Sequence, residues 1–286
     1  MKRDQISGHT RVFGLVGHPV RHSLSPAMYN TLFERFGIDA VYLAFDVHPD
    51  QAQKVAEMVR IMDLAGVNLT VPFKEQVLPH LDHATAASWE AGAVNVVTQM
   101  DGALMGYNTD GEGFVRSLSE EGGPSPQGLH AVILGAGGAA RAVASGLLDR
   151  GAERIVFLNR SKDRAQAAVD TLSKSYPSAA LSIAPLHKDA FEKTAKGSGL
   201  LVNCTSGPAA QTIAEFDPTI LSEHASWVDI NYWMKHPPGE TKVTESGRRF
   251  HNGLGMLAHQ GALAFELFTG YPATGSELRA FLLETL

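Results

Sequence analysis

The chain has 286 residues, of which 44% are hydrophobic and 19% charged, and its formal net charge is −6. This composition is typical of a packed globular protein with one large domain or two ordinary ones, and the mixed, slightly acidic charge argues against a nucleic-acid-binding surface. No apolar run reaches the roughly 18 residues of a membrane span, and residues 1–9 lack the apolar core of a signal peptide. A single cysteine, Cys204, excludes an internal disulfide. We therefore expect a cytoplasmic protein without a membrane segment.

The first part of the chain alternates predicted strands and helices. Strands are expected at 12–16, 41–45, 65–69, 93–97 and 103–105, the last two joined by a hairpin turn at Asp101-Gly102. A helix is expected to start with Ser25 as its N-cap and to end at Gly37, and a second helix covers 50–61. A third begins near 70–72, with Pro72 as its first residue and Lys74 in its first turn.

The second part follows a loop rich in glycine and proline at 121–128. Strands are expected at 130–134, 154–158, 181–184, 199–204 and 226–230, with helices between them. Parallel strands joined by helices form a doubly wound sheet. The segment 255–286 is predicted to form two helices, interrupted at 270–272.

A glycine-rich turn follows the strand at 130–134 and precedes a helix expected at 141–150. Gly135, Gly137 and Ala140 occupy the three small positions of the dinucleotide fingerprint. Such a turn lets the backbone approach a pyrophosphate at the start of a helix. Candidate cofactor-binding residues are Gly135, Ala136, Gly137, Gly138 and Ala139. Because the motif begins so late, we expect a separate domain before it to hold the substrate.

The end of the next predicted strand, 154–158, indicates which dinucleotide is bound. It is followed by Asn159, Arg160 and Ser161, with Arg164 one turn later. A carboxylate at this place would favour NAD, but Glu153 lies before the strand, at its wrong end. Because guanidinium groups pair with phosphate oxygens, these residues predict NADP as the cofactor.

Polar residues gather at the ends of predicted strands in the first part of the chain. They are Ser23 and Ser25, Asn68 and Thr70 with Lys74, Asn95, and the run 108–110. Ligands of open α/β sheets bind at the carboxyl ends of strands, so these groups suit a small polyhydroxylated acid. Each residue alone has a structural explanation, such as capping a helix or holding a turn. The histidines show no metal-ligand spacing, so no metal site is expected.

Seven motifs, in order along nearly the whole chain, resemble those of the shikimate dehydrogenase family: 17–26, 68–74, 92–95, 108–111, 135–141, 159–160 and 253–260. The resemblance implies an α/β protein with two domains. One is an N-terminal α/β substrate-binding and catalytic domain, 1–110 plus 253–286, and the other is a doubly wound Rossmann NADP domain, 111–252. It implies reversible NADPH-dependent reduction of 3-dehydroshikimate to shikimate, a step of aromatic amino acid biosynthesis.

The same resemblance assigns roles to single residues. Lys74 and Asp110 form the catalytic pair. Ketone reduction needs a proton for the developing alkoxide, so Lys74 either donates this proton, with Asp110 orienting it, or stabilises the alkoxide by its charge, and the sequence leaves both roles open. Residues assigned to the substrate are Ser23, Ser25, Asn68, Thr70, Asn95, Tyr232 and Gln260. Three segments depart from the family pattern: 203–208 continues into Ala209 without the usual methionine, Asn231 replaces an aliphatic residue, and Ser161 replaces a common threonine.

Two other functions remain open at this stage. One is a paralogous enzyme that oxidises quinate or an aminated analogue of shikimate, with NAD or NADP as its cofactor. The other is an NADP-binding sensor without catalytic activity. For each reading the expected ligands are small molecules, with no nucleic acid and no membrane as partner, and the expected oligomeric state is a monomer or a homodimer.

Overall fold

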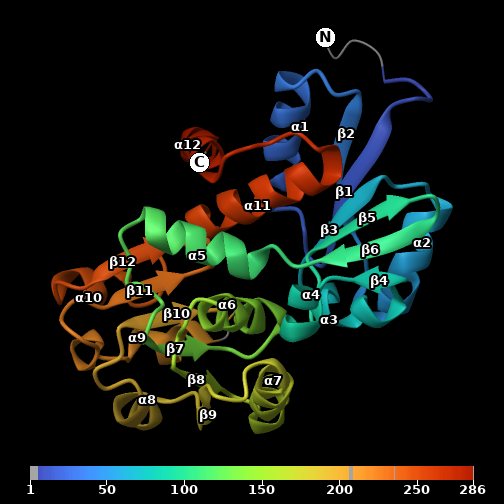
Figure 1. Cartoon of the computed structure of the whole chain (residues 1–286). Coiled ribbons are helices and arrows are strands. Elements are labelled where there is room, and N and C mark those ends of the chain that lie inside the picture. The colour runs from blue at the N-terminus through green and yellow to red at the C-terminus, as the bar shows by residue number, and fades with distance from the viewer. Residues whose placement is uncertain (1–5, 206–208, 235, 286) are drawn as a thin grey trace. The chain divides into compact units, whose positions relative to one another are not determined.

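The computed structural model describes residues 6–205, 209–234 and 236–285, which divide into two compact units (Figure 1). Unit 1 contains the described residues up to Thr109 and those from Ala258 onward, and unit 2 runs from Asp110 to Leu257. The chain thus passes between units at Thr109–Asp110 and Leu257–Ala258, where the sequence predicted 110–111 and 252–253. That each unit is an independent domain stays a prediction.

Unit 1 contains a mixed sheet with the strand order β2-β1-β3-β5-β6-β4. Strands β2, β1 and β3 run parallel to one another, whereas β3–β5 and β5–β6 are antiparallel. Asp101 and Gly102 both have positive φ angles, which confirms the predicted hairpin turn between β5 and β6. The strands are β1 (Arg11–Gly17), β2 (Ala40–Asp46), β3 (Gly66–Leu69), β4 (His83–Ala84), β5 (Val96–Met100) and β6 (Ala103–Tyr107).

Helices cover both faces of this sheet because its central strands present apolar side chains on each side. Val67, Leu69 and Val97 pack with α2 and α3 on one face. On the other face, Phe13 contacts Phe33 of α1 and Phe268 of α11. The helices are α1 (Ser25–Arg35), η1 (Pro49–Lys54), α2 (Val55–Ile61), α3 (Phe73–Gln76), η2 (Leu78–His80), α4 (Ala86–Ala91), α11 (Leu254–Thr269, whose first turn belongs to unit 2) and α12 (Gly275–Thr285).

Unit 2 contains an all-parallel sheet with the strand order β12-β11-β10-β7-β8-β9, which confirms the predicted doubly wound arrangement. The order reverses between β7 and β10, and such a switch point is where open α/β sheets bind ligands. The strands are β7 (His130–Leu134), β8 (Arg154–Asn159), β9 (Ala180–Pro185), β10 (Leu200–Asn203), β11 (Ser226–Asp229) and β12 (Arg249–Asn252).

Alternate residues of the central strands of unit 2 point to two helical layers. Ile133 and Val202 pack with α5, α6 and α7, whereas Val132 and Leu201 pack with α8, α9 and α10. The helices are α5 (Asp110–Glu120), α6 (Gly138–Leu148), α7 (Lys162–Ser175), α8 (Lys188–Thr194), α9 (Ala210–Ala214), η4 (Pro218–Ile220) and α10 (Glu240–Glu245).

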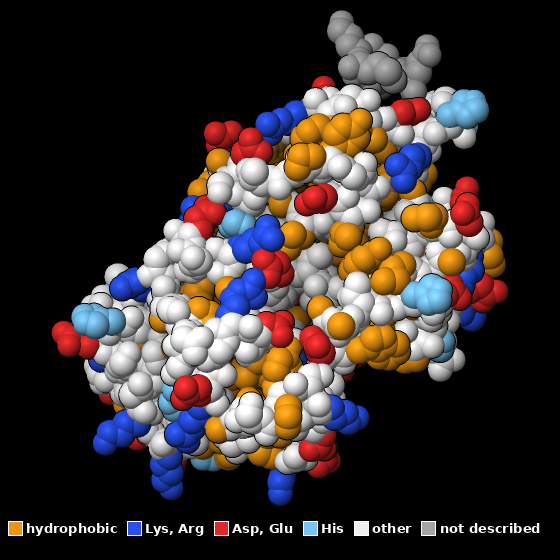
Figure 2. Space-filling view, in the orientation of Figure 1, with side chains coloured by type: hydrophobic (Ala, Val, Ile, Leu, Met, Phe, Trp, Pro, Cys, Tyr) orange, Lys and Arg blue, Asp and Glu red, His pale blue; other side chains and the backbone are white. Residues whose placement is uncertain are grey.

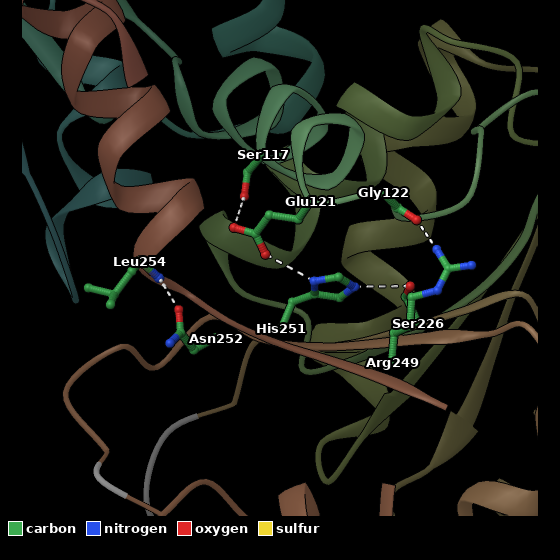
Figure 3. A network of polar contacts seen from close by, with 8 residues as sticks. All are labelled: Ser117, Glu121, Gly122, Ser226, Arg249, His251, Asn252 and Leu254. Carbon is green, nitrogen blue, oxygen red and sulfur yellow. Dashed lines mark hydrogen bonds and ion pairs between the residues drawn. The ribbon is translucent and has the colours of Figure 1, made fainter. Parts of the chain in front are cut away.

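A polar network in unit 2 connects the end of α5 to β11 and β12 (Figure 3). Glu121 accepts a hydrogen bond from Ser117 and pairs with Nδ1 of His251 at 2.9 Å. The other ring nitrogen of His251 lies 3.1 Å from Ser226 Oγ. A Cβ at Gly255, in the first turn of α11, would collide with Glu121 Oε1. The segment after α5 is therefore held against the start of α11.

Several local predictions are wrong. Leu24, not Ser25, is the N-cap of α1, and Pro72, predicted as the first helical residue, is the N-cap of the short helix α3. Residues 50–61 form a 3₁₀ turn followed by α2 instead of one helix. The edge strands β4 and β12 were not predicted, because they are short and polar and lack an alternating apolar pattern.

The surface of each unit is mixed in character. Figure 2 shows hydrophobic side chains scattered over the visible face of unit 1, and lysine and arginine side chains projecting where Figure 1 places α7 and α8. Among the helices of the described residues, none has the length and apolar character needed to cross a bilayer. In the same residues, His, Cys, Asp and Glu side chains form no group of three that could hold a metal ion.

Candidate active site

Asn95 lies where three predicted polar segments of unit 1 meet. Its carbonyl accepts the N–H of Leu69 at 2.9 Å, and its own N–H donates to the carbonyl of Tyr107 at 3.0 Å. One residue earlier, Val94 donates its N–H to the carbonyl of Lys74 at 2.8 Å. These backbone contacts bring the ends of β3 and β6 and the helix α3 together, at the place where the sequence predicts the substrate.

The side chain of Asn95 belongs to a hydrogen-bonded cluster that also includes Thr109 and Gln260. Asn95 Oδ1 accepts the N–H of Thr109 at 2.8 Å, and Nδ2 donates to Thr109 Oγ1 at 2.8 Å and to Gln260 Oε1 at 3.3 Å. Thr109 Oγ1 in turn donates to the carbonyl of Gln260. Because Oε1 of Gln260 accepts from Asn95, the orientation of the Gln260 amide group is fixed, with Nε2 as its donor atom.

Asn68 is buried at the end of β3, and its amide orientation is fixed by its neighbours. The hydroxyl of Tyr42 donates to Asn68 Oδ1 at 2.7 Å, and Asn68 Nδ2 donates to the carbonyl of Asn95 at 3.2 Å. Tyr42 is fully buried and stacks on Tyr29, with ring centroids 4.4 Å apart. Burial raises the pKa of the Tyr29 phenol, so this aromatic wall stays neutral.

The remaining predicted substrate residues of unit 1 lie in the adjoining turns. Ser23 Oγ accepts the backbone N–H of Ser25 at 3.2 Å, so the Ser23 hydroxyl proton can be donated elsewhere. Ser25 is buried as the first residue of α1. Thr70, half-buried after β3, accepts the N–H of Phe73 with its carbonyl, and Lys74 is half-buried in α3.

Asp110 is the first residue of α5 in unit 2 and is buried. The positive end of a helix dipole stabilises a carboxylate at this position. One residue later, Gly111 packs against α6, where a Cβ would collide with the carbonyl of Ala142. A Cβ at Gly146 would in turn meet the carbonyl of Gly111 at 2.6 Å. This close contact between two helix backbones fixes the start of α5 within unit 2.

The glycine-rich turn of unit 2 has the geometry that the fingerprint requires. Gly135 has a φ angle of +100°, and a Cβ there would lie 3.2 Å from the backbone of Cys204. Gly137 is the N-cap of α6, and Ala140 is buried in the contact between α6 and the sheet. The turn therefore places the N–H groups of a helix start at the switch point, which fits a dinucleotide pyrophosphate.

The end of β8 places the predicted NADP residues together. Asn159 Nδ2 donates to the carbonyl of Ser161, and Ser161 is the N-cap of α7, its Oγ accepting the N–H of Arg164 at 3.3 Å. Arg160 and Arg164 are exposed. Two guanidinium groups beside a helix start are suited to a phosphate monoester.

The carboxyl ends of β10 and β11 hold a buried polar group that the sequence analysis did not single out. Asp229 is fully buried and accepts hydrogen bonds from Asn203 and Asn231. Burial raises the pKa of the Asp229 carboxyl, and its N–H donors limit that increase. Tyr232 follows in a turn, half-buried, with its ring 5.2 Å from that of Trp233. Residues 206–208, in the segment 203–208 that departs from the family pattern, and residue 235 lie outside the described residues.

Two residues that bond to predicted substrate residues were not themselves predicted as site residues from the sequence. Thr109 stands between Asn108 and Asp110 in a motif that was noted, so its position was a usable signal. Tyr42 lies in the middle of β2, where an aromatic residue is usually part of the core, and nothing in the sequence indicates its bond to Asn68.

Comparisons with known proteins agree with this arrangement. Residues 15–97 match the model of the shikimate dehydrogenase substrate binding domain, residues 117–207 that of shikimate / quinate 5-dehydrogenase, and residues 253–273 that of the shikimate 5′-dehydrogenase C-terminal domain. A relative from Methanopyrus kandleri, named shikimate dehydrogenase (NADP(+)), is 40% identical over 98% of each chain.

Solved structures give the same result. The shikimate 5-dehydrogenase of Listeria monocytogenes in complex with shikimate and NAD has a TM-score of 0.85, is 31% identical and covers 98% of each chain. The shikimate 5-dehydrogenase of Thermus thermophilus in complex with NADP(H) and shikimate has a TM-score of 0.82 and is 36% identical, covering 96% of this chain and 100% of the other. The chain therefore belongs to the shikimate dehydrogenase family.

Proposed function

We propose that this chain catalyses the reversible reduction of 3-dehydroshikimate to shikimate with NADPH, as part of aromatic amino acid biosynthesis. The observation that carries the proposal is the cluster of Asn68, Asn95, Thr109 and Gln260 in unit 1, in a family whose relatives are named for this reaction. We place the reaction in the cytoplasm, with the enzyme as a monomer or homodimer.

The groups of unit 1 suit a hydroxylated ring acid. Nδ2 of Asn68 and Nε2 of Gln260 are oriented as donors, because the oxygen of each amide accepts from a neighbour. These donors would hold ring hydroxyl or keto oxygens, together with Asn95 and Thr70. Ser23 and Ser25 would donate hydroxyl protons to the substrate carboxylate, and Tyr232 is assigned to the same substrate.

Lys74 and Asp110 are proposed as the catalytic pair. The Lys74 ammonium group would donate a proton to the oxygen that becomes the new hydroxyl, and it would take the proton back in the reverse reaction. Asp110 would orient this group. Bound NADPH supplies the hydride. Gly135 to Ala139 would hold the pyrophosphate, and Asn159, Arg160, Ser161 and Arg164 would bind the adenosine 2′-phosphate.

The test is absorbance of the reduced nicotinamide with shikimate or quinate, each combined with NADP or NAD. We expect turnover with shikimate and NADP, and a fall in kcat of about 10²-fold or more in Lys74→Met, because a positioned proton donor contributes that much. A preference for quinate with NAD would instead assign the paralogous activity, and NADP binding without turnover would assign the sensor.

A double variant tests the cofactor assignment separately. Arg160→Ala combined with Arg164→Ala should raise the KM for NADP and leave the KM for NAD nearly unchanged, because only NADP carries the 2′-phosphate. Equal changes for both dinucleotides would contradict the assignment of these arginines.

A further inference from the structure

Four residues of unit 2 form a closed ring of hydrogen bonds. Asp229 Oδ2 accepts from Asn203 Nδ2 at 2.8 Å, and Asn203 Oδ1 accepts from both the N–H and the hydroxyl of Thr205. The carbonyl of Thr205 accepts from Asn231 Nδ2 at 2.8 Å. Asn231 Nδ2 also donates to Asp229 Oδ1 at 2.7 Å, which closes the ring.

The ring joins the loops that follow two neighbouring strands. Asn203 and Asp229 are the last residues of β10 and β11 and are partners in the parallel register of these strands. Thr205 lies on the loop after β10, and Asn231 on the loop after β11, directly before Tyr232. The bond from Asn231 to the carbonyl of Thr205 thus joins one loop directly to the other.

The ring lies next to the glycine-rich turn. The N–H of Cys204 donates to the carbonyl of Leu134 at 2.9 Å, and the backbone of Cys204 is the group that a Cβ at Gly135 would approach. Cys204 and Thr205 therefore border the switch point between β7 and β10, where the dinucleotide is expected. A shift of Thr205 would change the space available beside Gly135.

Asn231 is the residue on which closure of the ring depends. Both hydrogens of its Nδ2 are used, one for Asp229 and one for Thr205, and its backbone N–H also donates to Asp229 Oδ1 at 2.9 Å. The side chain is 5% exposed. A hydrocarbon side chain here would leave the Thr205 carbonyl without this donor and would remove one donor from a fully buried carboxylate.

We propose that Asn231 is a positioning residue that couples the dinucleotide edge at Cys204–Thr205 to the loop carrying Tyr232. One amide group thereby sets the placement of both loops. This inference rests on the proposed function, because it uses the dinucleotide site beside Gly135 and the assignment of Tyr232 to the substrate. Loss of the Asn231 amide is expected to weaken the binding of both dinucleotide and substrate. Loss of a residue that contacts only one of them would weaken the binding of that one alone.

The first experiment measures KM for NADP and for shikimate, together with kcat, in Asn231→Leu. Both KM values should rise, each by about tenfold, which is the effect of roughly one buried hydrogen bond. Tyr176→Phe is the matched control, because it removes a hydroxyl that bonds Asp149 and Ser145 elsewhere in unit 2. It should lower stability and leave both KM values as in the wild type.

The second experiment uses Asn231→Asp and its pH profile. A carboxyl group at 231 can bridge to Asp229 only while a proton is shared between the two acids. The ratio of variant to wild-type KM should therefore be large at about pH 8 and should fall several-fold at about pH 6, where carboxyl pairs hold a proton more readily. A purely structural defect would show no such recovery.

The outcomes separate the inference from the proposed function. If the wild-type protein does not turn over shikimate with NADP, the proposed function itself is refuted. An active wild type whose Asn231→Leu variant keeps both KM values, or raises only one, would overturn the coupling. Should Asn231→Leu fail to fold, the Asn231→Asp profile decides: a ratio that does not change with pH rejects the proposal.

Discussion

Two networks connect the same pair of chain segments, one in each unit, and they differ in charge. In unit 1, Thr109, directly before α5, bonds Gln260 of α11 through neutral hydroxyl and amide groups. In unit 2, Glu121, directly after α5, pairs with His251, which lies just before α11 (Figure 3). The neutral network includes the predicted substrate residue Asn95, whereas the ionisable one includes no predicted site residue.

The difference has a physical reason. A neutral amide cluster keeps donors available for a ligand at modest desolvation cost, and its orientation does not depend on protonation. An acid–histidine pair gives a stronger contact in a nearly buried place, where both side chains are only 11% and 12% exposed. We therefore expect the unit 1 network to affect substrate binding and the unit 2 network to affect stability.

The largest effect is expected from breaking the ionisable network. Glu121→Ala should lower the free energy of unfolding by about 2–3 kcal/mol, because it leaves His251 and Ser117 without their acceptor. Urea unfolding of wild type and variant measures this change. Glu121→Gln keeps an acceptor oxygen, so its free energy of unfolding should fall by less than that of Glu121→Ala. The KM for shikimate should stay as in the wild type, and a large increase would contradict the division of roles.

The neutral network is tested by Thr109→Val, which has nearly the same shape but no hydroxyl. It removes the bond to the Gln260 carbonyl and the acceptor for Asn95 Nδ2. We expect a loss of about 1–2 kcal/mol in stability and a rise of about tenfold in the KM for shikimate. The KM for NADP should not change. Equal changes for substrate and cofactor would show that Thr109 acts on the whole fold and not on the substrate residues.

The two networks also show what sequence patterns can reveal. The glycine motif and the parallel sheet were predictable because their signals are local: Gly135, Gly137 and Ala140 are close in sequence, and apolar runs mark the strands. The bond between Thr109 and Gln260 joins residues 151 positions apart, and no local pattern encodes it. Asn68 and Asn95 were noted at the ends of predicted strands and, like Gln260, were assigned to the substrate by resemblance. The structure adds which amide atom of Asn68 and of Gln260 acts as the donor.

A similar limit applies to Asp229 and Asn231. In sequence, Asp229 is an acidic residue at the end of an apolar strand and could be read as a surface residue. Only the register of β10 and β11 places it beside Asn203, fully buried. The failed N-cap assignment of Ser25 has a comparable origin, since Leu24 already has helical φ and ψ angles and Ser23 provides the side-chain acceptor.

A smaller effect is expected from Tyr42→Phe, which refines the neutral side of the comparison. The variant removes only the hydroxyl that fixes Asn68 Oδ1. Stability should fall by about 1 kcal/mol, and the KM for shikimate should rise several-fold, because the Asn68 amide can then rotate and lose its donor orientation. Tyr176→Phe serves as the control for a lost tyrosine hydroxyl. Should both variants change the KM equally, the orienting role of Tyr42 would be rejected.

The smallest effect is a pH dependence of stability that we expect from the buried carboxyl group of Asp229 in unit 2 and not from the neutral network of unit 1. Burial raises the pKa of Asp229 in the folded protein above the ordinary value of about 3.9. The unfolded chain then ionises first as the pH rises, so the contribution of this group to stability is present below about pH 3.9 and is lost as the pH rises through the folded-state pKa. Each unit of increase in the pKa corresponds to about 1.4 kcal/mol.

The measurement is the difference in unfolding free energy between wild type and Asp229→Asn, from urea titrations at several pH values above about 4. This difference should shrink as the pH rises, because the asparagine does not titrate. Other carboxylates change stability with pH in the opposite direction; one is Asp82, whose pKa is lowered by the Leu104 N–H and by Arg60. Their contribution is the same in wild type and variant, so it cancels from the difference. The corresponding difference for Thr109→Val should stay constant with pH, because the bonds that Thr109 makes with Asn95 and Gln260 involve neutral groups. A difference for Asp229→Asn that grows with pH would mean that the three N–H donors outweigh burial and that the ring stabilises the carboxylate.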